Sequence, residues 1–343
     1  MNNTYLWTEQ MLKPRTIMRR IWLLLALSAY CLTGLGQDSN VDTYVAVTDL
    51  PDNNTFAIII SNEHYKHEVE VQFALNDGAV FQRYLTKTLG VPEKNIKFVP
   101  DASLNDMNYN LKWLENVMNV KDGEARAIVY YSGHGMPDDD SKKAYLLPID
   151  GYSSEPTSGL STESLYKRLG TMKSRQTLVF LDACFSGAKR DGGMMQSARA
   201  VAIKAKKDAV NGNMVIFSAT EAGQTAYPLK SKEHGLFTYY ILESLQKSGG
   251  CITLGELSDR VTKLVNQAAV IENEKPQTPT INAGADASDW RNWQFASEAA
   301  KRYETMSRPK VAMGTTTPSV SQQPTNTPPA QNKNKHSFVR RNQ

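Results

Sequence analysis

The sequence predicts an α/β fold, a three-layer sandwich in which a mainly parallel, six-stranded sheet is covered by helices on both faces. Short, continuous apolar runs alternate along the chain with segments whose apolar residues recur at helical spacing. This alternation is typical of βαβ units, which build parallel sheets. The run at 56–62 is continuous and apolar, as expected for a strand buried on both faces. At 343 residues the chain is also long enough to bury a large core.

Six apolar runs predict the strands, and five periodic segments predict the helices. In chain order the strands are expected at 56–62, 96–101, 125–135, 176–187, 213–220 and, as an edge strand, 277–283. The helices are expected at 75–90, 103–120, 161–172, 234–247 and 254–271. A short hairpin strand is expected at 144–150.

Residues at the helix boundaries support two of these assignments. Asn76 and Asp77 are start signals for the first helix, and Gly90 is its stop signal. Ser161 is expected to cap the third helix, with Ser164 near the third helical position.

Two segments lie outside the strand–helix pattern. Residues 188–212 separate the fourth and fifth strands and hold six basic and two acidic residues. Residues 308–343 are rich in Thr, Pro, Gln and Asn without apolar periodicity, which predicts a disordered tail. The predicted organisation is a signal peptide at 1–36, an N-terminal extension at 37–55, an α/β domain at 56–300 that contains the basic linker 188–212, and the tail at 308–343.

The N-terminus has the pattern of an export signal. Two arginines at 19–20 precede the apolar run at 21–35, and Gly34 and Gly36 precede the expected cleavage site before Gln37. The run is shorter than the roughly 20 apolar residues of a bilayer-spanning helix. The sequence therefore predicts export to the periplasm, cell surface or medium, with cleavage favoured over anchoring. Met18 is an alternative start, and Tyr30 disfavours a lipid anchor at Cys31 because such sites need a small preceding residue.

The charge of the chain is concentrated at its ends. The formal net charge is +4, but residues 37–307 hold 29 basic and 34 acidic residues. A mildly acidic central domain argues against a nucleic-acid-binding surface. No membrane span is expected in the chain once the signal is removed.

Polar residues cluster where the predicted strands end. The carboxyl ends of parallel strands are the edge at which α/β sheets place their active sites. The clusters are Asn62 with Glu63, Ser132 to Gly135, Asp182 with Cys184, and Ser218 to Glu221.

Cys184 and His134 form a candidate nucleophile and base. A thiol attacks an acyl carbon as the thiolate, and its ordinary pKa of about 8.5 makes a neighbouring imidazole necessary near neutral pH. His134 lies between two glycines at the end of the strand expected beside that of Cys184. The pair predicts acyl transfer, with the backbone N–H groups of Gly135 and Cys184 holding the oxyanion. This chemistry requires no cofactor.

Less specific roles are the alternatives for the same residue types. Two cysteines remain after signal cleavage, too few for a disulfide scaffold, but a Cys184–Cys251 pair is an alternative. The other histidines are expected to be ordinary surface or core residues, namely His64, His67, His234 and His336.

The motifs YYSGHG and LDACFSG resemble those of caspase- and metacaspase-like cysteine peptidases, in particular their bacterial members. The histidine precedes the cysteine by 50 positions here, and caspases carry their histidine about 50 residues upstream of the cysteine. Further similar stretches are HYKHEVEVQFALNDGAV, SATEAGQTAYP, HGLFTYYILESL and PQTPTI, so the resemblance covers about 56–285. It implies a caspase-type sandwich with Cys184 as the nucleophile and His134 as the general base.

Departures from the caspase pattern indicate the substrate. Caspases carry glutamine two positions before the nucleophile and prefer an acidic P1 residue, whereas this chain has Asp182 there, as metacaspases and paracaspases do. Asp77 matches the other aspartate that lines the P1 pocket in those groups, and Ser132 matches a polar residue of the pocket wall. Glu221 is a further candidate pocket residue, although its alignment is loose. Two carboxylates would attract a guanidinium or ammonium group, so cleavage after Arg or Lys is expected. The alternatives are a helix cap for Asp77 and a solvated strand-end acid for Asp182.

The basic segment 188–212 matches the linker that caspases cut between their two subunits. Self-cleavage of a zymogen is expected there, and the alternative is a solvated loop. The candidate positions are Lys189, Arg190, Arg199, Lys204, Lys206 and Lys207.

Calcium dependence is a weaker expectation. Many metacaspases depend on Ca²⁺, and the aspartates at 138–140 form an oxygen-rich run of the kind that calcium binds. These aspartates do not align with the ligands of that family, and the usual role of such a run is a solvated loop. No other metal site is predicted.

The sequence thus predicts an exported cysteine endopeptidase that cleaves peptides or proteins after Arg or Lys. One rival is a catalytically silent caspase-like module that binds peptides or partners. A second is a peptidase with an acidic P1 preference, which would need a basic pocket that the motifs do not supply. A third is a cell-surface structural protein with a Pro/Thr stalk, which would leave the histidine and cysteine motifs unexplained.

Overall fold

The computed structural model describes residues 40–138, 141, 143–185, 209–221 and 223–296. The predicted signal peptide, the C-terminal tail and most of the basic linker therefore lie outside the described residues. In the described part, no helix has the length and apolar character needed to cross a membrane.

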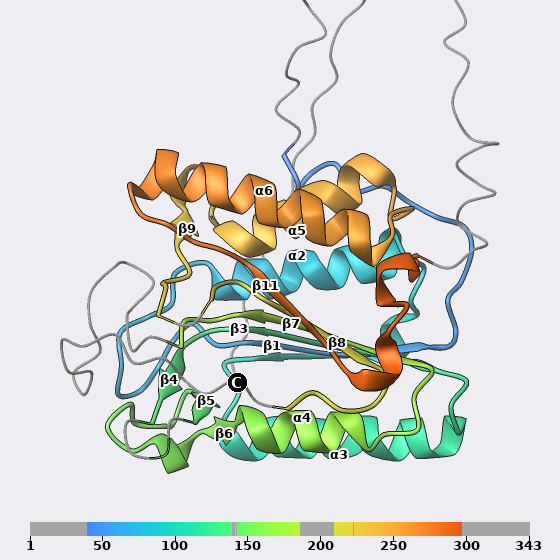
Figure 1. Cartoon of the computed structure of the whole chain (residues 1–343), viewed down its shortest axis with the longest axis horizontal. Helices are drawn as coiled ribbons and strands as arrows, with labels where there is room; N and C mark the ends of the chain where they lie inside the picture. Colours follow the sequence, from blue (N-terminus) through green and yellow to red (C-terminus); the bar gives the residue numbers. More distant parts are fainter. Residues whose placement is uncertain (1–39, 139–140, 142, 186–208, 222, 297–343) are drawn as a thin grey trace, which may run out of the picture. The chain divides into compact units, whose positions relative to one another are not determined.

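A six-stranded sheet forms the centre of the fold (Figure 1). Its strand order is β11-β8-β7-β3-β1-β2, and only the edge strand β11 runs antiparallel to its neighbour. The strands are β1 (Thr55–Ser61), β2 (Ile96–Pro100), β3 (Arg126–Ser132), β7 (Gln176–Asp182), β8 (Met214–Ser218) and β11 (Thr280–Ala283). The predicted mainly parallel, six-stranded sheet with a late edge strand is confirmed.

Helices cover both faces of this sheet, as Figure 1 shows. One layer holds α2 (Ala74–Lys87), α5 (Leu236–Ser248) and α6 (Leu254–Asn273). The other holds α3 (Leu104–Lys121) and α4 (Thr162–Gly170). Alternate residues of β1 divide between two cores, because successive side chains of a strand point to opposite faces. Ile59 packs in the core under α2 and α5, whereas Ile58 and Ile60 pack in the core under α3 and α4.

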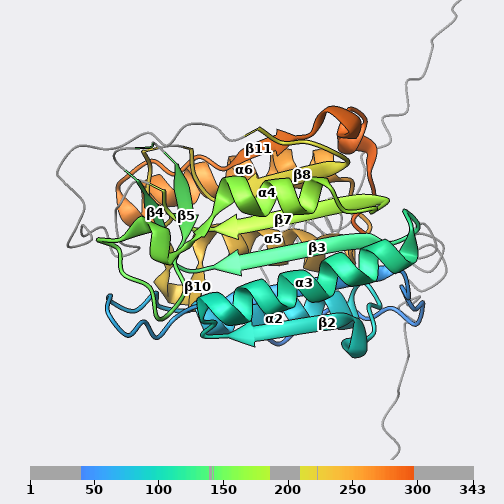
Figure 2. The same ribbon diagram turned by 90° about the horizontal axis from the view of Figure 1, so that it is seen from below.

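Smaller elements lie at the carboxyl edge of the sheet. A three-stranded sheet comprises β4 (Gly135–Pro137), β5 (Ala144–Leu146) and β6 (Leu160–Ser161), and β9 (Pro228–Leu229) pairs with β10 (His234–Gly235). Figure 2 shows β4 and β5 beyond the arrowheads of β3 and β7. Short 3₁₀ turns occur at Glu93–Asn95, Pro156–Ser158, Lys230–Lys232, Ala285–Ala287 and Trp290–Asn292.

The start of α2 differs from the prediction. Neither Asn76 nor Asp77 is the N-cap of this helix. The N-cap is Phe73, whose backbone is left-handed and whose side chain makes no capping hydrogen bond. Instead, the Glu63 carboxylate accepts a hydrogen bond from the Leu75 N–H at 2.9 Å. The alternative role of Asp77 as a helix cap is therefore wrong, and its side chain makes other contacts. The prediction for α4 is confirmed, because Ser161 is the N-cap and accepts from the Ser164 N–H.

The third strand is shorter than predicted. β3 ends at Ser132, and the chain turns at Gly133 before it enters β4 at Gly135. The carboxyl end of β3 is thus a turn between two sheets, and His134 lies in that turn rather than in the strand.

Residues 40–54 pack against the α/β domain. The Thr48 N–H donates to the carbonyl at the end of α2. Deeper in the fold, the buried Asp52 carboxylate forms an ion pair of 2.9 Å with Arg126 at the start of β3. Arg126 also donates to the carbonyl of Phe295 at 2.7 Å. One buried guanidinium therefore joins the first and last described segments to the central sheet.

Candidate active site

The two candidate catalytic residues leave neighbouring strands at the same edge of the sheet. Ser132 at the end of β3 is in register with Asp182 at the end of β7. The Gly133 N–H continues the pairing by donating to the Asp182 carbonyl at 3.2 Å. A Cβ on Gly135 would lie 2.5 Å from the Cys184 carbonyl oxygen, so the backbones that carry His134 and Cys184 are in close contact.

His134 is held from several sides. It is 3% exposed, and its backbone N–H donates to the Tyr65 hydroxyl at 2.8 Å. The Tyr131 hydroxyl donates to its carbonyl at 2.7 Å, and the Tyr65 ring lies against the imidazole, with ring centroids 4.7 Å apart. The turn therefore fixes both the backbone and the ring of this histidine.

The Val69 carbonyl selects the tautomer of His134. Its oxygen lies 2.8 Å from Nε2, and because a carbonyl only accepts, Nε2 must carry a proton. In the neutral ring Nδ1 then carries the lone pair and can act as a base. The sequence offered no signal for Val69, because the contribution comes from its backbone rather than its side chain.

Cys184 has a backbone donor directed at its sulfur. The Ala226 N–H lies 2.8 Å from Sγ, and the Ala226 carbonyl lies 3.7 Å away. A donor directed at sulfur stabilises the thiolate, which is the nucleophilic form. The side chain is 5% exposed and packs in the core that includes Ala226 and Leu229. Cys184 and Cys251 are both thiols, so the alternative of a disulfide between them is wrong.

The N–H of Gly135, a predicted oxyanion donor, is not part of the pairing between β4 and β5. Alternate residues of an antiparallel strand hydrogen bond to the partner strand. His134 and Asp138, which flank β4, hydrogen bond to Leu147 and Lys143 on the β5 side, so Gly135 falls in the alternate position. The N–H of Gly135 therefore points away from β5, and its Cα lies beside the Cys184 backbone.

Asp77 is a fully buried carboxylate. Gly235 N–H donates to it at 3.0 Å and the Ser132 hydroxyl at 3.3 Å. Nδ1 of His234 lies 2.8 Å from the same carboxylate. The structure thus brings two of the predicted pocket residues, Asp77 and Ser132, into contact.

Asp182 is also fully buried, so the alternative of a solvated strand-end acid is wrong. The Thr238 hydroxyl and N–H donate to its carboxylate at 2.7 and 3.3 Å. Tyr130 lies 2.8 Å from the same hydroxyl, and because that hydroxyl already donates to Asp182, Tyr130 is the donor. Gly235 is the N-cap of α5 and Thr238 lies in its first turn, so the two carboxylates share the positive end of one helix dipole.

The remaining predicted residues lie apart from this cluster or outside the described part. Glu221 is exposed and accepts from the Gln224 amide at 2.6 Å. Gln224 in turn contacts Thr278 just before β11, which places Glu221 toward the edge of the sheet. Lys189, Arg190, Arg199, Lys204, Lys206 and Lys207 lie outside the described residues.

His234 is a residue that sequence reasoning missed. It was predicted to be an ordinary histidine, but its buried ring lies between Asp77 and Asp42, whose oxygens are 2.8 and 3.0 Å from Nδ1 and Nε2. Burial lowers the pKa of His234, but the hydrogen bonds and charges of Asp77 and Asp42 outweigh burial and raise it. The one sequence feature that could have drawn attention to His234 is its position in a His-Gly pair directly before a helix. That feature does not reveal the contacts with Asp77 and Asp42.

Within the described ranges, no group of three or more His, Cys, Asp or Glu side chains has the arrangement of a metal site. Of the oxygen-rich run, Asp138 is described, while Asp139 and Asp140 are not. Calcium dependence therefore remains an untested prediction.

Comparisons with known proteins identify the family. The model of the caspase domain, peptidase family C14, matches residues 54–287. Among solved structures, protein GSU0716 from Geobacter sulfurreducens is 18% identical, with a TM-score of 0.51 over 71% of this chain and 98% of that one. Caspase-1 from Spodoptera frugiperda is 16% identical, with a TM-score of 0.48 over 73% of this chain and 92% of that one. A comparison with curated proteins found no match. The family match covers more than half of the sequence, and the chain belongs to the caspase-domain family of cysteine peptidases.

Proposed function

We propose that the protein is a cysteine endopeptidase that hydrolyses peptide bonds after Arg or Lys. The observation that carries this proposal is that Cys184 and His134 lie at one edge of the sheet and that a backbone group contacts each of their side chains. The Ala226 N–H faces the Cys184 sulfur, and the Val69 carbonyl holds a proton on Nε2 of His134 and leaves Nδ1 as the base. Buried Asp77 and Asp182 lie next to the same edge.

The reaction follows the usual steps of acyl transfer. The thiol proton of Cys184 passes to Nδ1 of His134, and the sulfur bonds to the carbonyl carbon of the substrate. The N–H groups of Gly135 and Cys184 hold the oxyanion. The C–N bond then breaks, and the amine leaves with the proton from His134. Water attacks the thioester and gives one proton to His134. The C–S bond then breaks, the carboxylic acid product leaves, and His134 returns the proton to the sulfur, which restores the thiol.

The preference for Arg or Lys at P1 rests on charge. Asp77 of α2 and Asp182 of β7 both accept hydrogen bonds from the start of α5, and Asp77 also accepts one from the Ser132 hydroxyl. A guanidinium group can bind a carboxylate through two parallel hydrogen bonds, and an ammonium group binds it as a point charge. Both carboxylates are covered in this structure, so the proposal requires the pocket to open for substrate.

The test uses peptides that differ only at P1. Purified protein is offered fluorogenic peptides that end in Arg, Lys, Asp or Asn, with Ca²⁺ or with a chelator. We expect cleavage after Arg and Lys, abolished in Cys184→Ala and retained in the matched control Cys251→Ser. Cleavage after Asp alone would overturn the P1 assignment. Absence of cleavage of every peptide, together with no labelling of Cys184 by an arginyl chloromethylketone, would favour a catalytically silent binding module.

We further propose that the enzyme is made as an exported zymogen and cleaves itself in 188–212. The candidate sites are basic, which fits the proposed P1 preference. Time courses of the purified protein and of Cys184→Ala on a denaturing gel test this proposal. Two fragments from the active protein alone support it, and identical single bands refute it. N-terminal sequencing of protein recovered outside the cytoplasm tests the signal peptide.

A further inference from the structure

A single histidine joins two carboxylates from distant parts of the chain. His234 on β10 has no exposed side-chain area; its Nδ1 lies 2.8 Å from Oδ1 of Asp77, and its Nε2 lies 3.0 Å from Oδ1 of Asp42. Asp77 belongs to the first turn of α2, and Asp42 belongs to the N-terminal segment 40–54. The bridge therefore connects the start of the described chain to a carboxylate of the proposed P1 pocket.

The second carboxylate is itself held in place. Arg83 of α2 donates to the Asp42 carbonyl, and Tyr84 donates to the neighbouring Val41 carbonyl at 3.1 Å. The Asp42 N–H donates to the Asn40 side chain at 2.7 Å. Segment 40–42 is thus fastened to α2 independently of the histidine.

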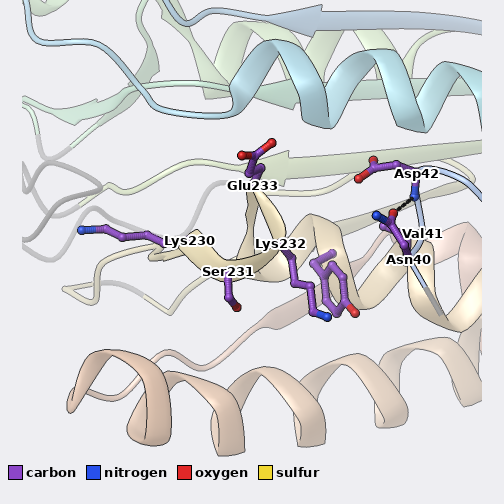
Figure 3. Close-up of a pocket in the computed structure, with 8 residues that line it drawn as sticks. Asn40, Val41, Asp42, Lys230, Ser231, Lys232 and Glu233 are labelled. Atoms are coloured by element: carbon purple, nitrogen blue, oxygen red, sulfur yellow. Dashed lines mark hydrogen bonds between the residues drawn. The ribbon is translucent and has the colours of Figure 1, made fainter. Parts of the chain in front are cut away.

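The two ring nitrogens of His234 face carboxylates, and the groups farther from the ring are of mixed character. From α2, Asn76 lies 3.4 Å from Nε2 beside Asp77, and from α5 the Tyr239 ring lies 6.1 Å away. Asp42 faces the ring from the N-terminal segment. Lys230 and Lys232 of the 3₁₀ turn before β10, with Glu233 that follows it, line a cavity of about 210 Å³ together with Asp42 (Figure 3).

Both bridges require a protonated ring. A carboxylate accepts hydrogen bonds, so each imidazole nitrogen must donate to its partner, and only imidazolium has two N–H donors. The raised pKa of His234 is consistent with this state. Loss of the proton removes one donor and leaves two carboxylates around a neutral ring.

We propose that His234 is a positioning residue for the P1 pocket: Asp42 fixes its ring through Nε2, and its Nδ1–H holds the Asp77 carboxylate in the orientation that receives the P1 side chain. This inference rests on the proposed function. It makes residues 40–42 part of the specificity machinery although they precede the strands of the fold. A protonated His234 also leaves the Asp42–His234–Asp77 group with one net negative charge, which suits a single cationic side chain.

Two substitutions separate the two contacts of His234. The amide nitrogen of Asn lies where Nδ1 lies, and that of Gln lies where Nε2 lies. His234→Asn therefore keeps the donor to Asp77, whereas His234→Gln loses it. A hydrogen bond between charged partners justifies an expected rise in KM of roughly tenfold for Arg peptides in His234→Gln. We expect kcat to change less than about twofold, and KM in His234→Asn to rise less than about threefold.

Asp42→Asn tests the link to the N-terminal segment. Removal of this charge should lower the pKa of His234, because Asp42 stabilises the imidazolium. NMR titration of the His234 ring in Cys184→Ala measures that pKa without activity. Calorimetric binding of an acetylated peptide ending in arginine amide, also to Cys184→Ala, should weaken as pH rises through the His234 pKa. The midpoint should move to lower pH in Asp42→Asn.

The outcomes distinguish this inference from the proposed function. Wild-type protein that cleaves Arg peptides, with KM unchanged in His234→Gln, would overturn the positioning role and leave the peptidase intact. A His234 pKa that is the same with and without the Asp42 charge would overturn the bridge itself. Wild-type protein that neither cleaves nor binds Arg peptides would overturn the proposed function, and the positioning role with it, whatever the pKa of His234.

Discussion

The Ala226 amide nitrogen lies 2.8 Å from the sulfur of Cys184, although 42 positions separate the two residues in the chain. The contact directs a backbone donor at the atom that would carry negative charge in the proposed reaction. Cys184 follows β7, and Ala226 lies in the segment between β8 and β9. A neighbouring loop therefore supplies a donor to the proposed nucleophile, and the effect of this donor can be measured without substrate.

We expect Cys184 to react faster with iodoacetamide than Cys251 at pH 7. Cys251 is the more exposed thiol, so exposure alone predicts the opposite order. A donor directed at sulfur favours the thiolate, which is the reactive form. Peptide mapping by mass spectrometry gives both rates in one sample. Faster labelling of Cys251 across pH 6–8 would show that the Ala226 contact does not activate the thiol.

Tyr65→Phe tests the support beneath His134. The substitution keeps the ring against the imidazole but removes the hydroxyl that accepts from the His134 N–H at 2.8 Å. A buried N–H without an acceptor costs about 1–3 kcal/mol, and we expect a loss of stability of that size with kcat lowered about tenfold. Thermal unfolding and peptide assays measure the two effects. Tyr109→Phe is the matched control, because that ring is 75% exposed and its substitution should change neither quantity.

Gly135→Ala tests the close approach of the two active-site backbones. The added Cβ would lie 2.5 Å from the Cys184 carbonyl oxygen and 2.8 Å from the Phe185 ring. One of these groups must move, and overpacking of this kind costs about 1–3 kcal/mol. We expect kcat to fall at least tenfold, because the displacement separates the proposed oxyanion donor from the nucleophile. A Gly135→Ala enzyme that retains wild-type kcat would exclude this close geometry.

The sheet could be predicted because its signals are local. Most of the parallel strands are short, largely apolar runs, and the polar residues at the ends of β3 and β7 mark the edge of the candidate site. The resemblance to caspases supplied the roles expected of His134 and Cys184. Both kinds of signal can be read without knowledge of long-range contacts.

The supporting groups could not be predicted because they depend on distant backbone atoms. Val69 acts through its backbone carbonyl and Ala226 through its backbone N–H. Every residue type provides the carbonyl, and every type except proline provides the N–H, so the residue type gives no signal. The start of α2 is capped by Glu63 from 12 positions upstream. His234 meets Asp77 and Asp42 across 157 and 192 positions, and no periodicity or motif encodes such separations.

The buried ion pair between Arg126 and Asp52 should dominate the stability of the N-terminal segment. Both side chains are nearly inaccessible, and removal of one partner leaves an unpaired buried charge, which costs about 3–5 kcal/mol. We expect Asp52→Ala to lower the free energy of unfolding by that amount in urea denaturation. The control is Lys173→Ala, which removes an exposed ion pair with Asp122 and should have no measurable effect. Equal unfolding midpoints for the two variants would contradict the prediction.

The pH dependence of the free energy of unfolding should reveal the stabilising contribution of protonated His234. Its folded-state pKa is raised above the ordinary value of about 6.5, so between these two pKa values the folded protein binds more protons than the unfolded chain. The stability that His234 contributes is therefore complete below pH 6.5 and is lost as pH rises through the folded pKa. Urea denaturation of Cys184→Ala across pH 6–9 should show this fall, and the double variant Cys184→Ala/His234→Asn should show a flatter profile. If the two profiles have the same slope in this window, the imidazolium between Asp42 and Asp77 does not stabilise the fold.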